Sequence, residues 1–285
     1  MVVRSDKLPA PGETILGGVF LMTAGGKGAN QAVAAAKLGA KVTFACKVGD
    51  DIFGRQALHC FRQAGINTNF VLTDPVYPSG VALILVDGRG ENSISVAPGA
   101  NGALQISDLE NVIEQIKKND IVLIQLEIPI PTVAYAIKSC CDKGARVILN
   151  PAPAHLLDDG LFRFINTITP NENEAELLTG IKIYNVQTAA KAAIILQNKG
   201  VSNVIITMGP KGAYLHNSVL QMLIPSPVVK PVDSTAAGDV FNGALAVALT
   251  EHQDIAQAVA FACKAAAVSV TRMGAQASAP VRSEL

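Results

Sequence analysis

The sequence has no tryptophan, few aromatic residues and no net charge. Aromatic residues make up 5 % of the chain, and 23 basic residues balance 23 acidic ones. Proteins that bind nucleic acid present a basic surface, often interleaved with aromatic side chains, and the sequence has no such stretch. Nucleic acid is therefore not an expected partner. An anionic substrate would need a local binding site, because a neutral chain has no overall field to attract it.

The chain also lacks C-x-x-C motifs and long apolar runs. Its cysteines are odd in number and two of them are adjacent: Cys46, Cys60, Cys140, Cys141 and Cys263. This pattern favours free thiols in a reducing compartment over disulfides or a zinc site. No apolar run reaches the length of a membrane-spanning helix, and the N-terminus lacks the basic-then-apolar order of a signal peptide. We therefore predict a soluble, cytoplasmic protein with no membrane partner.

Apolar strands that alternate with helices dominate what is present. Hydrophobic residues form 49 % and charged residues 16 % of the 285 positions, which suits one large three-layer domain. From residue 100 onward, apolar strands such as 120–127, 146–153 and 201–209 alternate with helical segments. This alternation is typical of an α/β fold whose mostly parallel sheet is covered by helices on both faces.

Residues 80–99 break this alternation. Two apolar segments are joined by Asp87-Gly88-Arg89-Gly90, a hairpin signal, with no helix between them. A hairpin fits poorly inside a parallel sheet, so we assign it to a small antiparallel β lid. We expect the lid to comprise residues 1–24 and 80–99, and the α/β core to comprise residues 25–79 and 100–285.

Three glycines surround Lys27 in "GGKGANQA", residues 25–32, directly before an Ala-rich helix. Backbone amides at a helix start can bind an anion or polar hydroxyl groups. The segment is not a Walker A loop, because Gly28 stands where Ser or Thr is needed, and Gln31 replaces the third glycine of G-x-G-x-x-G. The residues alone leave a ligand loop and a tight turn equally open.

Two further sites lie where strands end, which is where ligands bind in such sheets. Glu127 could accept hydrogen bonds from sugar hydroxyls, although a solvated strand end is the simpler interpretation. Asn171 and Glu174 are three residues apart at a helix start and share one face. They suit either ordinary helix capping or water-mediated magnesium binding beside the phosphates of a nucleotide.

The segment "DSTAAGD", from Asp233 to Asp239, places very small residues at the start of the apolar helix "VFNGALAVALTE". Its N–H groups and the helix dipole would bind negative charge, which indicates an anion hole. A carboxylate there would repel a phosphate unless Asp239 acts as a general base toward an attacking hydroxyl. The alternative is that Asp239 caps the helix.

Several segments together resemble the ribokinase-type (PfkB) family of carbohydrate kinases. "GGKGANQAVAAAKLGAKVTFACKVGDDIFG" is similar to the first family signature, and "DSTAAGDVFNGALAVAL" is similar to the second. "QLEIP", "LNPAPA", "TPNENEAELLTG" and "VTRMGAQASAP" continue the match in order. The resemblance covers almost the whole chain. It implies a three-layer Rossmann-like fold with a small lid, and ATP-dependent phosphorylation of D-ribose at the 5-hydroxyl.

The resemblance also assigns roles to individual residues. Asp239 matches the general base, and the backbone of Ala236, Ala237 and Gly238 matches the anion hole. Residues that match the sugar site are Gly25, Gly26, Lys27, Asn30, Glu127 and Asp239 itself. Asn171 and Glu174 match an N-x-x-E element tied to magnesium and phosphate, and the nucleotide loop is matched by Thr207, Gly209 and Gly212.

A monovalent cation, usually potassium, accompanies the anion hole in this family. The matching residues, several of them through carbonyl oxygens, are Asp233, Thr235, Ser269, Arg272, Gly274 and Ser278. The family's small sheet covers the sugar and commonly pairs two subunits, so a homodimer through the lid is expected.

The chain departs from the family at both ends. Family members open with a buried strand that ends in an Asn-x-Asp-type motif, and Asp6 does not replace its aspartate. After "SAPVRSEL" the family usually adds a closing helix. We therefore expect either a shortened record or an impaired kinase. The open alternatives are a kinase for deoxyribose, another pentose or a nucleoside, and a non-catalytic sugar or nucleotide binder.

Overall fold

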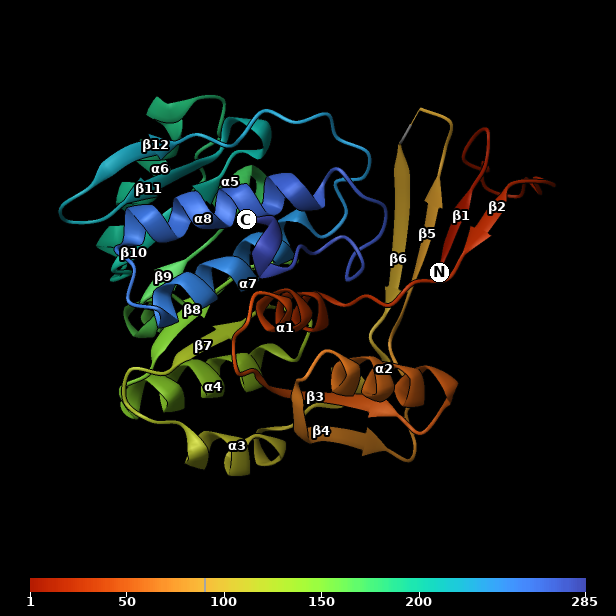
Figure 1. The fold of residues 1–285 in the computed structure, drawn as a ribbon, viewed down its shortest axis with the longest axis horizontal. Coiled ribbons are helices and arrows are strands. Elements are labelled where there is room, and N and C mark those ends of the chain that lie inside the picture. The colour runs from red at the N-terminus through yellow and green to blue at the C-terminus, as the bar shows by residue number, and fades with distance from the viewer. Residues whose placement is uncertain (90) are drawn as a thin grey trace.

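A six-stranded sheet forms the centre of the larger part of the molecule in the computed structural model, which describes residues 1–89 and 91–285 (Figure 1). The strand order is β12-β11-β10-β9-β8-β7. Neighbours from β7 to β10 run parallel, whereas β11 and β12 continue the sheet antiparallel. The strands are β7 (Ile121–Ile124), β8 (Arg146–Leu149), β9 (Thr167–Ile168), β10 (Asn203–Thr207), β11 (Ala213–His216) and β12 (Gln221–Ile224).

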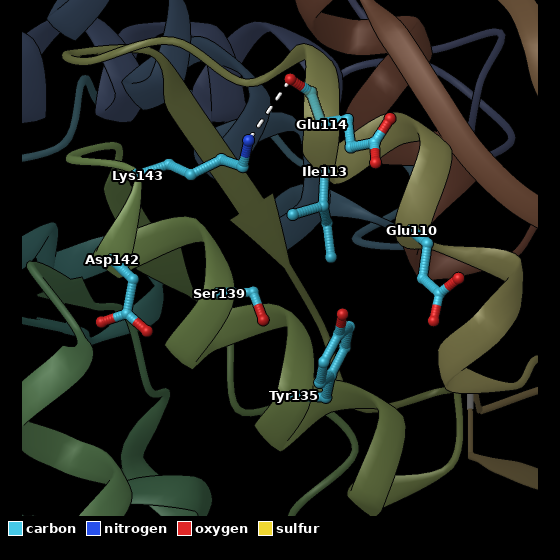
Figure 2. Close-up of a pocket in the computed structure, with 7 residues that line it drawn as sticks. All are labelled: Glu110, Ile113, Glu114, Tyr135, Ser139, Asp142 and Lys143. Carbon is cyan, nitrogen blue, oxygen red and sulfur yellow. Dashed lines mark hydrogen bonds between the residues drawn. The ribbon is translucent and has the colours of Figure 1, made fainter.

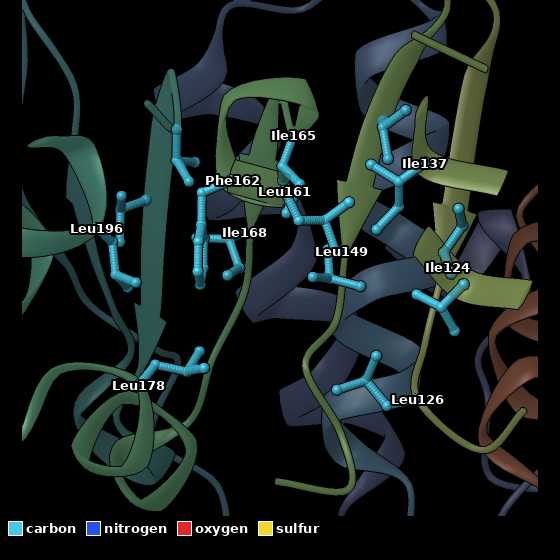
Figure 3. Close-up of a cluster of buried hydrophobic side chains, with 14 of the residues drawn as sticks. Ile124, Leu126, Ile137, Leu149, Leu161, Phe162, Ile165, Ile168, Leu178 and Leu196 are labelled. Carbon is cyan, nitrogen blue, oxygen red and sulfur yellow. The ribbon is translucent and has the colours of Figure 1, made fainter. Parts of the chain in front are cut away.

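Helices cover both faces of this sheet, because its central strands are apolar on both sides. In β8, Val147 and Leu149 pack with the helices of one face, and Ile148 between them packs with the helices of the other. Figure 3 shows the first of these clusters around Leu149, Phe162 and Ile168. The helices of the first face are α3 (Glu110–Gln115), α4 (Ile130–Asp142), α5 (Glu172–Thr179) and α6 (Val186–Asn198), and those of the second are α1 (Lys27–Lys37), α7 (Ala237–Thr250) and α8 (Ile255–Ser269).

A parallel pair of strands, β3 (Thr43–Gly49) and β4 (Asn67–Asp74), forms a separate two-stranded sheet with α2 (Ile52–Gln63) beside it. Within the described residues, this pair is not hydrogen-bonded to the six-stranded sheet. Helix α1 joins the two parts, because Ala32 and Val33 pack toward β3 and α2 while Ala34 and Ala35 pack toward α7 (Figure 1). The sequence analysis missed β4, whose polar first half hides the strand pattern.

A four-stranded sheet stands to one side of the core with the order β2-β1-β5-β6 (Figure 1). Its strands are β1 (Val2–Arg4), β2 (Val19–Leu21), β5 (Val81–Val86) and β6 (Asn92–Ala97). The expected hairpin β5–β6 is present, and its predicted turn residue Gly90 lies outside the described residues. The sheet is not wholly antiparallel as expected, because β1 pairs with β5 in parallel. Strands so far apart in sequence have no tight turn to force them antiparallel.

Two of the three chain crossings between this sheet and the core, before β5 and after β6, pack against each other. The amide of Ala100 donates to the carbonyl of Pro78 over 2.7 Å. The carboxylate of Asp51, which also caps α2, accepts hydrogen bonds from the amide and hydroxyl of Ser79 over 2.7 and 2.8 Å. The small sheet is therefore held to the core at its base by short, specific contacts.

No helix within residues 1–89 and 91–285 is long and apolar enough to cross a membrane. Short 3₁₀ helices complete the structure. The 3₁₀ helices are η1 (Gly99–Ala103), η2 (Ile106–Asp108), η3 (Asp159–Phe164), η4 (Gly209–Lys211) and η5 (Arg282–Glu284).

Candidate active site

A cavity of about 180 Å³ lies at the carboxyl ends of β8, β9 and β10, where α1, α5 and α7 begin. Its lining combines residues that are far apart in sequence but are brought together because parallel strands end at one edge of the sheet. These are Lys27, Asn150, Ala152, Thr169, Asn171, Glu174, Thr207, Ser234, Ala236, Ala237, Gly238, Asp239 and Asn242.

Asp239 is one of two buried carboxylates that line this cavity, the other being Glu174, and 6 % of its surface is exposed. Its Oδ2 accepts a hydrogen bond from Asn30 Nδ2 over 2.8 Å, and its Oδ1 accepts one from Gln31 Nε2 over 3.0 Å. Burial raises the pKa of Asp239, and the hydrogen bonds from Asn30 and Gln31 and the charge of Lys27 oppose that rise only in part. A carboxylate with a raised pKa is a better proton acceptor than an ordinary aspartate.

Very small residues form the start of α7. The residue before the helix, Ala236, has a left-handed backbone with φ of 60°, and within the described residues no side chain caps the helix. Asp239 does not cap α7, because its carboxylate is bonded to side chains of α1. The capping alternative is therefore wrong. The amide of Ala237 lies 3.3 Å from the carbonyl of Ser234, and Gly238 lines the cavity at the positive end of the helix dipole.

The glycine loop before α1 meets the segment that follows β7. Gly26 has φ of 94° and directly precedes the helix. The amide of Lys27 donates to Glu127 Oε2 over 2.7 Å. Asn101 Nδ2 donates to the carbonyl of Glu127 over 2.9 Å. Glu127 therefore accepts a hydrogen bond from the backbone of the glycine loop and is not simply a solvated strand end. Its negative charge also raises the pKa of Asp239.

Asn30 has one polar atom that the protein leaves open. Because its Nδ2 donates to Asp239, its Oδ1 points elsewhere and has no hydrogen-bond partner among the described residues. Asn30 is 6 % exposed, so an unmet acceptor there is costly unless a ligand supplies a donor.

Asn171 and Glu174 form a capping box at the start of α5. Asn171 Oδ1 accepts from the Glu174 amide, and the Asn171 amide and Nδ2 donate to the two carboxylate oxygens of Glu174, each over 2.9 Å. Burial raises the pKa of Glu174 despite these bonds. Both residues also line the cavity, so capping and a ligand role coexist at one site.

Of the three residues predicted for the nucleotide loop, one lines the cavity and two do not. Thr207 ends β10 and lines the cavity, while Gly209 begins η4 and Gly212 follows it, both outside the cavity lining. Gly212 has φ of 104°, and a Cβ atom built on it would lie 2.0 Å from the carbonyl oxygen of Ile224. Close packing against β12 is therefore enough to explain why residue 212 is a glycine.

Asp233 lies on the other side of the 233–238 loop from Asp239. Its Oδ1 accepts from the amide of Thr235 and its Oδ2 from the amide of Gly274, each over 2.9 Å. The bonds from Thr235 and Gly274 outweigh burial and lower the pKa of Asp233, so it is ionised at neutral pH. Arg272 directs its guanidinium to Glu284 instead, at 3.2 Å between Nη1 and Oε2.

Ser269 and Ser278 are the other two predicted cation ligands, and both of their hydroxyls already donate hydrogen bonds. Each donates to a backbone carbonyl of its own segment, Ser269 to Ala266 over 2.8 Å and Ser278 to Ala275 over 2.9 Å. Both residues are buried. Their hydroxyl oxygens still have lone pairs for a cation.

Three cavity residues whose side chains carry hydrogen bonds were not predicted from the sequence: Asn150, Thr169 and Asn242. The signal for Asn150 was its place directly after a buried strand, in "RVILNPAP". Gln31 was noticed only because it breaks the G-x-G-x-x-G pattern, although its side chain contacts Asp239. Nothing in the local pattern of α7 marks Asn242, which looks like an ordinary helix residue.

A larger hollow of about 460 Å³ lies between α3 and α4 (Figure 2). Its polar contact joins Lys143 Nζ to the carbonyl of Glu114 over 3.3 Å. None of the predicted site residues lines it. Size does not decide which cavity is functional, and only the smaller one gathers convergent, buried polar groups with a shifted carboxylate.

Comparisons with known proteins identify the family of the chain. The pfkB family of carbohydrate kinases matches residues 1–282. A ribokinase of Haemophilus influenzae is 44 % identical over 283 residues, which cover 99 % of this chain and 92 % of the relative. A deoxyribokinase of Salmonella typhi is 40 % identical over 281 residues, which cover 98 % and 92 %. The structure of Arabidopsis thaliana ribokinase complexed with ribose and ATP has a TM-score of 0.92 at 31 % identity, over 99 % of this chain and 92 % of that one.

Fold and relatives define the class of the protein as a sugar kinase with the ribokinase-type three-layer fold. The chain belongs to the pfkB family of carbohydrate kinases.

Proposed function

We propose that the protein transfers the γ-phosphoryl group of ATP to the 5-hydroxyl of D-ribose, giving ribose 5-phosphate and ADP. The observation that carries the proposal is Asp239, a buried carboxylate with a raised pKa beside the uncapped start of α7. Relatives named ribokinase at 44 % and 43 % identity support ribose as the sugar.

In this proposal Asp239 is the general base. It accepts the proton of the 5-hydroxyl as the oxygen attacks the γ-phosphorus and the bond to ADP breaks. The two carboxylate oxygens each accept one protein hydrogen bond and keep a second lone pair for the sugar proton. The amides of Ala236, Ala237 and Gly238 bind the phosphoryl oxygens on which charge develops.

The sugar would bind beside the glycine loop. Asn30 Oδ1, on the side chain that bonds to Asp239, is the open acceptor for a sugar hydroxyl, and Lys27 lines the cavity. Glu127 and the backbone of Gly25 and Gly26 add further polar contacts next to them. Thr207 lines the cavity from the end of β10, where the nucleotide would lie, and Gly209 and Gly212 shape the turn that follows.

Magnesium fits this site as a hydrated ion. Within the described residues, no three His, Cys, Asp or Glu side chains come together as direct ligands. Glu174 and Asn171 line the cavity, and each Glu174 oxygen keeps a lone pair beyond its bond to Asn171. These two residues would hold the ion through water, and a bound ion would neutralise phosphate charge. Chelation with EDTA should abolish turnover, and full activity without a divalent ion would contradict the assignment.

A monovalent cation fits beside Asp233, which is ionised and keeps lone pairs on both oxygens. The carbonyl groups of Thr235, Arg272 and Gly274 and the hydroxyls of Ser269 and Ser278 would complete the site, with the Arg272 side chain directed away. A bound cation would order the 233–238 loop without contacting the sugar.

Asp233→Ala is expected to slow turnover about tenfold at saturating potassium. Losing one charge-assisted hydrogen bond costs about 1.5 kcal/mol or more, and about 1.4 kcal/mol in the barrier is tenfold in rate. Initial rates measured across a potassium series test this, with sodium as the control ion. Unchanged rates and an unchanged potassium response would remove Asp233 from the cation site.

The small sheet is proposed to pair two subunits. Its register aligns Leu21, Val2, Ile84 and Ile94 across four strands on one face, and Leu21 and Ile94 are exposed. An exposed apolar sheet face of this kind marks an interaction surface. Sedimentation at several protein concentrations tests the pairing, and a monomer throughout would contradict it.

We also place the enzyme in the cytoplasm, where its substrate ATP is available. All five cysteines are free thiols. Burial raises the pKa of Cys46 to about 12 and that of Cys140 and Cys263 to about 11, which keeps these three thiols unreactive. Recovery of the native protein only from outside the cell would contradict this placement.

The substrate is tested by coupled detection of ADP with ATP, magnesium, potassium and a panel of sugars. We expect the highest kcat/KM with D-ribose. The second candidate is 2-deoxy-D-ribose, because a deoxyribokinase is 40 % identical to the chain. A preference for deoxyribose, another pentose or a nucleoside would overturn the choice of sugar. Calorimetric binding of ribose and ATP without ADP formation would identify a non-catalytic binder.

A further inference from the structure

Three buried amide side chains surround the base without a role in the steps above. They are Gln31 in α1, Asn150 after β8 and Asn242 in α7, with 2 %, 6 % and 1 % of their surfaces exposed. Burying an amide is costly unless its hydrogen bonds are met. Three of them around one carboxylate therefore require an explanation.

The first half of their network joins the base to the sheet. Gln31 Nε2 donates to Asp239 Oδ1 and to Asn150 Oδ1, in both cases over 3.0 Å. Asn150 Nδ2 then lies 3.4 Å from the carbonyl of Thr169, at the end of β9. One glutamine thus ties Asp239 to the carboxyl ends of two central strands.

The second half returns to the anion hole. The hydroxyl of Thr169 donates to Asn242 Oδ1 over 2.6 Å, and Asn242 Nδ2 donates to the carbonyl of Gly238 over 2.8 Å. Gly238 is the residue before Asp239. The hydrogen bonds therefore close a ring that starts at the carboxylate and ends at its own backbone.

We propose that this ring of Gln31, Asn150, Thr169 and Asn242 is a positioning device that fixes the Asp239 carboxylate relative to the amides of the anion hole. The inference rests on the proposed function, because it assigns the ring to the same base. It treats the four residues as positioning residues, since Asp239 and the backbone of α7 act on the substrates.

The two ends of the ring have different consequences. Gln31 donates to the charged form of Asp239 and stabilises it, so its loss should make the carboxylate harder to ionise. Asn242 bonds to the Thr169 hydroxyl and the Gly238 carbonyl and not to the carboxylate, so its loss should affect alignment without changing the proton affinity of Asp239. The charged groups around Asp239 are Lys27, which favours ionisation, and Glu127 and Glu174, which oppose it. These are the same in both variants.

The experiment compares Gln31→Met with Asn242→Leu and uses Thr132→Val as the matched control. Thr132 is equally buried and donates to the carbonyl of Leu104 over 2.9 Å, outside the ring. We expect kcat to fall by up to about 10²-fold in both ring variants, as misplaced catalytic groups do, and to stay near the native value in the control. The acid limb of kcat/KM should move to higher pH only in Gln31→Met.

A second readout needs no turnover. The Asp239 carboxyl carbon, assigned by its absence from Asp239→Asn, is titrated by carbon-13 NMR in the native protein and in each variant. Gln31→Met should titrate at higher pH than native, and Asn242→Leu should not. If Gln31→Met fails to fold, Gln31→Asn shortens the same amide by one methylene and takes its place.

The outcomes separate the two levels of inference. If the native protein phosphorylates no sugar but the Asp239 titration moves as expected, the proposed function is wrong and the ring is real. If the native protein is active while Gln31→Met keeps its kcat, its acid limb and its Asp239 titration, the ring has no positioning role. A kcat loss in Thr132→Val equal to that of the ring variants would also overturn it.

Discussion

Asp239→Asn is expected to lower kcat for ribose phosphorylation by about 10²- to 10⁴-fold, because an amide cannot accept the proton of the attacking hydroxyl. The substitution is nearly isosteric, so the cavity should keep its shape. Calorimetry should show that ribose and ATP still bind. Asp254→Asn is the matched control, because Asp254 caps α8 far from the cavity and asparagine caps a helix almost equally well.

The same substitution should not destabilise the fold. The pKa of Asp239 is raised in the folded protein, so the folded state binds more protons than the unfolded state between the two pKa values. The contribution of this group therefore falls as pH rises through that window, and above it the buried charge weakens the fold. Urea unfolding at neutral pH should give Asp239→Asn a free energy of unfolding equal to or above that of the native protein. A marked loss would show that Asp239 is structural, and near-native turnover would exclude it as the base.

Gly243→Ala should impair both stability and turnover, although alanine is normally the better helix residue. In an open helix the change would gain about 0.5–1 kcal/mol. Here a Cβ atom on Gly243 would lie 2.7 Å from the carbonyl oxygen of Gln31 and 2.9 Å from the Cβ of Ala34. Overpacking of this kind costs about 1–3 kcal/mol, which exceeds the gain from the better helix propensity of alanine.

The loss of turnover follows from the identity of the obstructed residue. Gln31 holds Asp239 through its side chain, and pushing its backbone away from α7 would separate the amide from the carboxylate. We expect kcat to fall by up to about 10²-fold. Ala246→Ser adds one heavy atom to the same helix at a half-buried position and is the control. Urea unfolding and initial rates measure both effects, and a more stable, fully active Gly243→Ala would contradict the close approach of α1 and α7.

The predicted class of fold depended on patterns that are local in sequence. Continuous apolar strands such as β8 can be buried on both faces only in a parallel sheet with helices on each side, and the structure has that arrangement. The hairpin of residues 80–99 could also be predicted from the sequence, because no helix separates its strands. The parallel pairing of β1 with β5 could not be predicted in this way. It joins segments about eighty residues apart, and the sequence of a strand does not show whether its partner runs parallel or antiparallel.

The site divides in the same way. Small residues between Asp233 and Asp239 indicated exposed amides at a helix start, and the two acids were expected to differ in role. Whether Asp239 caps its helix could not be decided locally, because an aspartate near a helix start suits both roles. In the structure the Asp239 carboxylate accepts hydrogen bonds from Asn30 and Gln31, which are more than 200 positions away, and these bonds take the place of a helix cap.

The sequence by itself determined the layers of the fold, the small-residue helix start that we propose as an anion hole, and the candidate base, because each depends on residue type and spacing within one segment. Only the tertiary structure decided which polar side chains meet. Asn150, Thr169 and Asn242 look unremarkable in their own segments and gain their importance because the ends of parallel strands and the starts of helices converge at one edge of a sheet. Burial at that edge raises the pKa of Asp239 and makes the contacts of Gln31 matter, and burial is a property of the assembled fold.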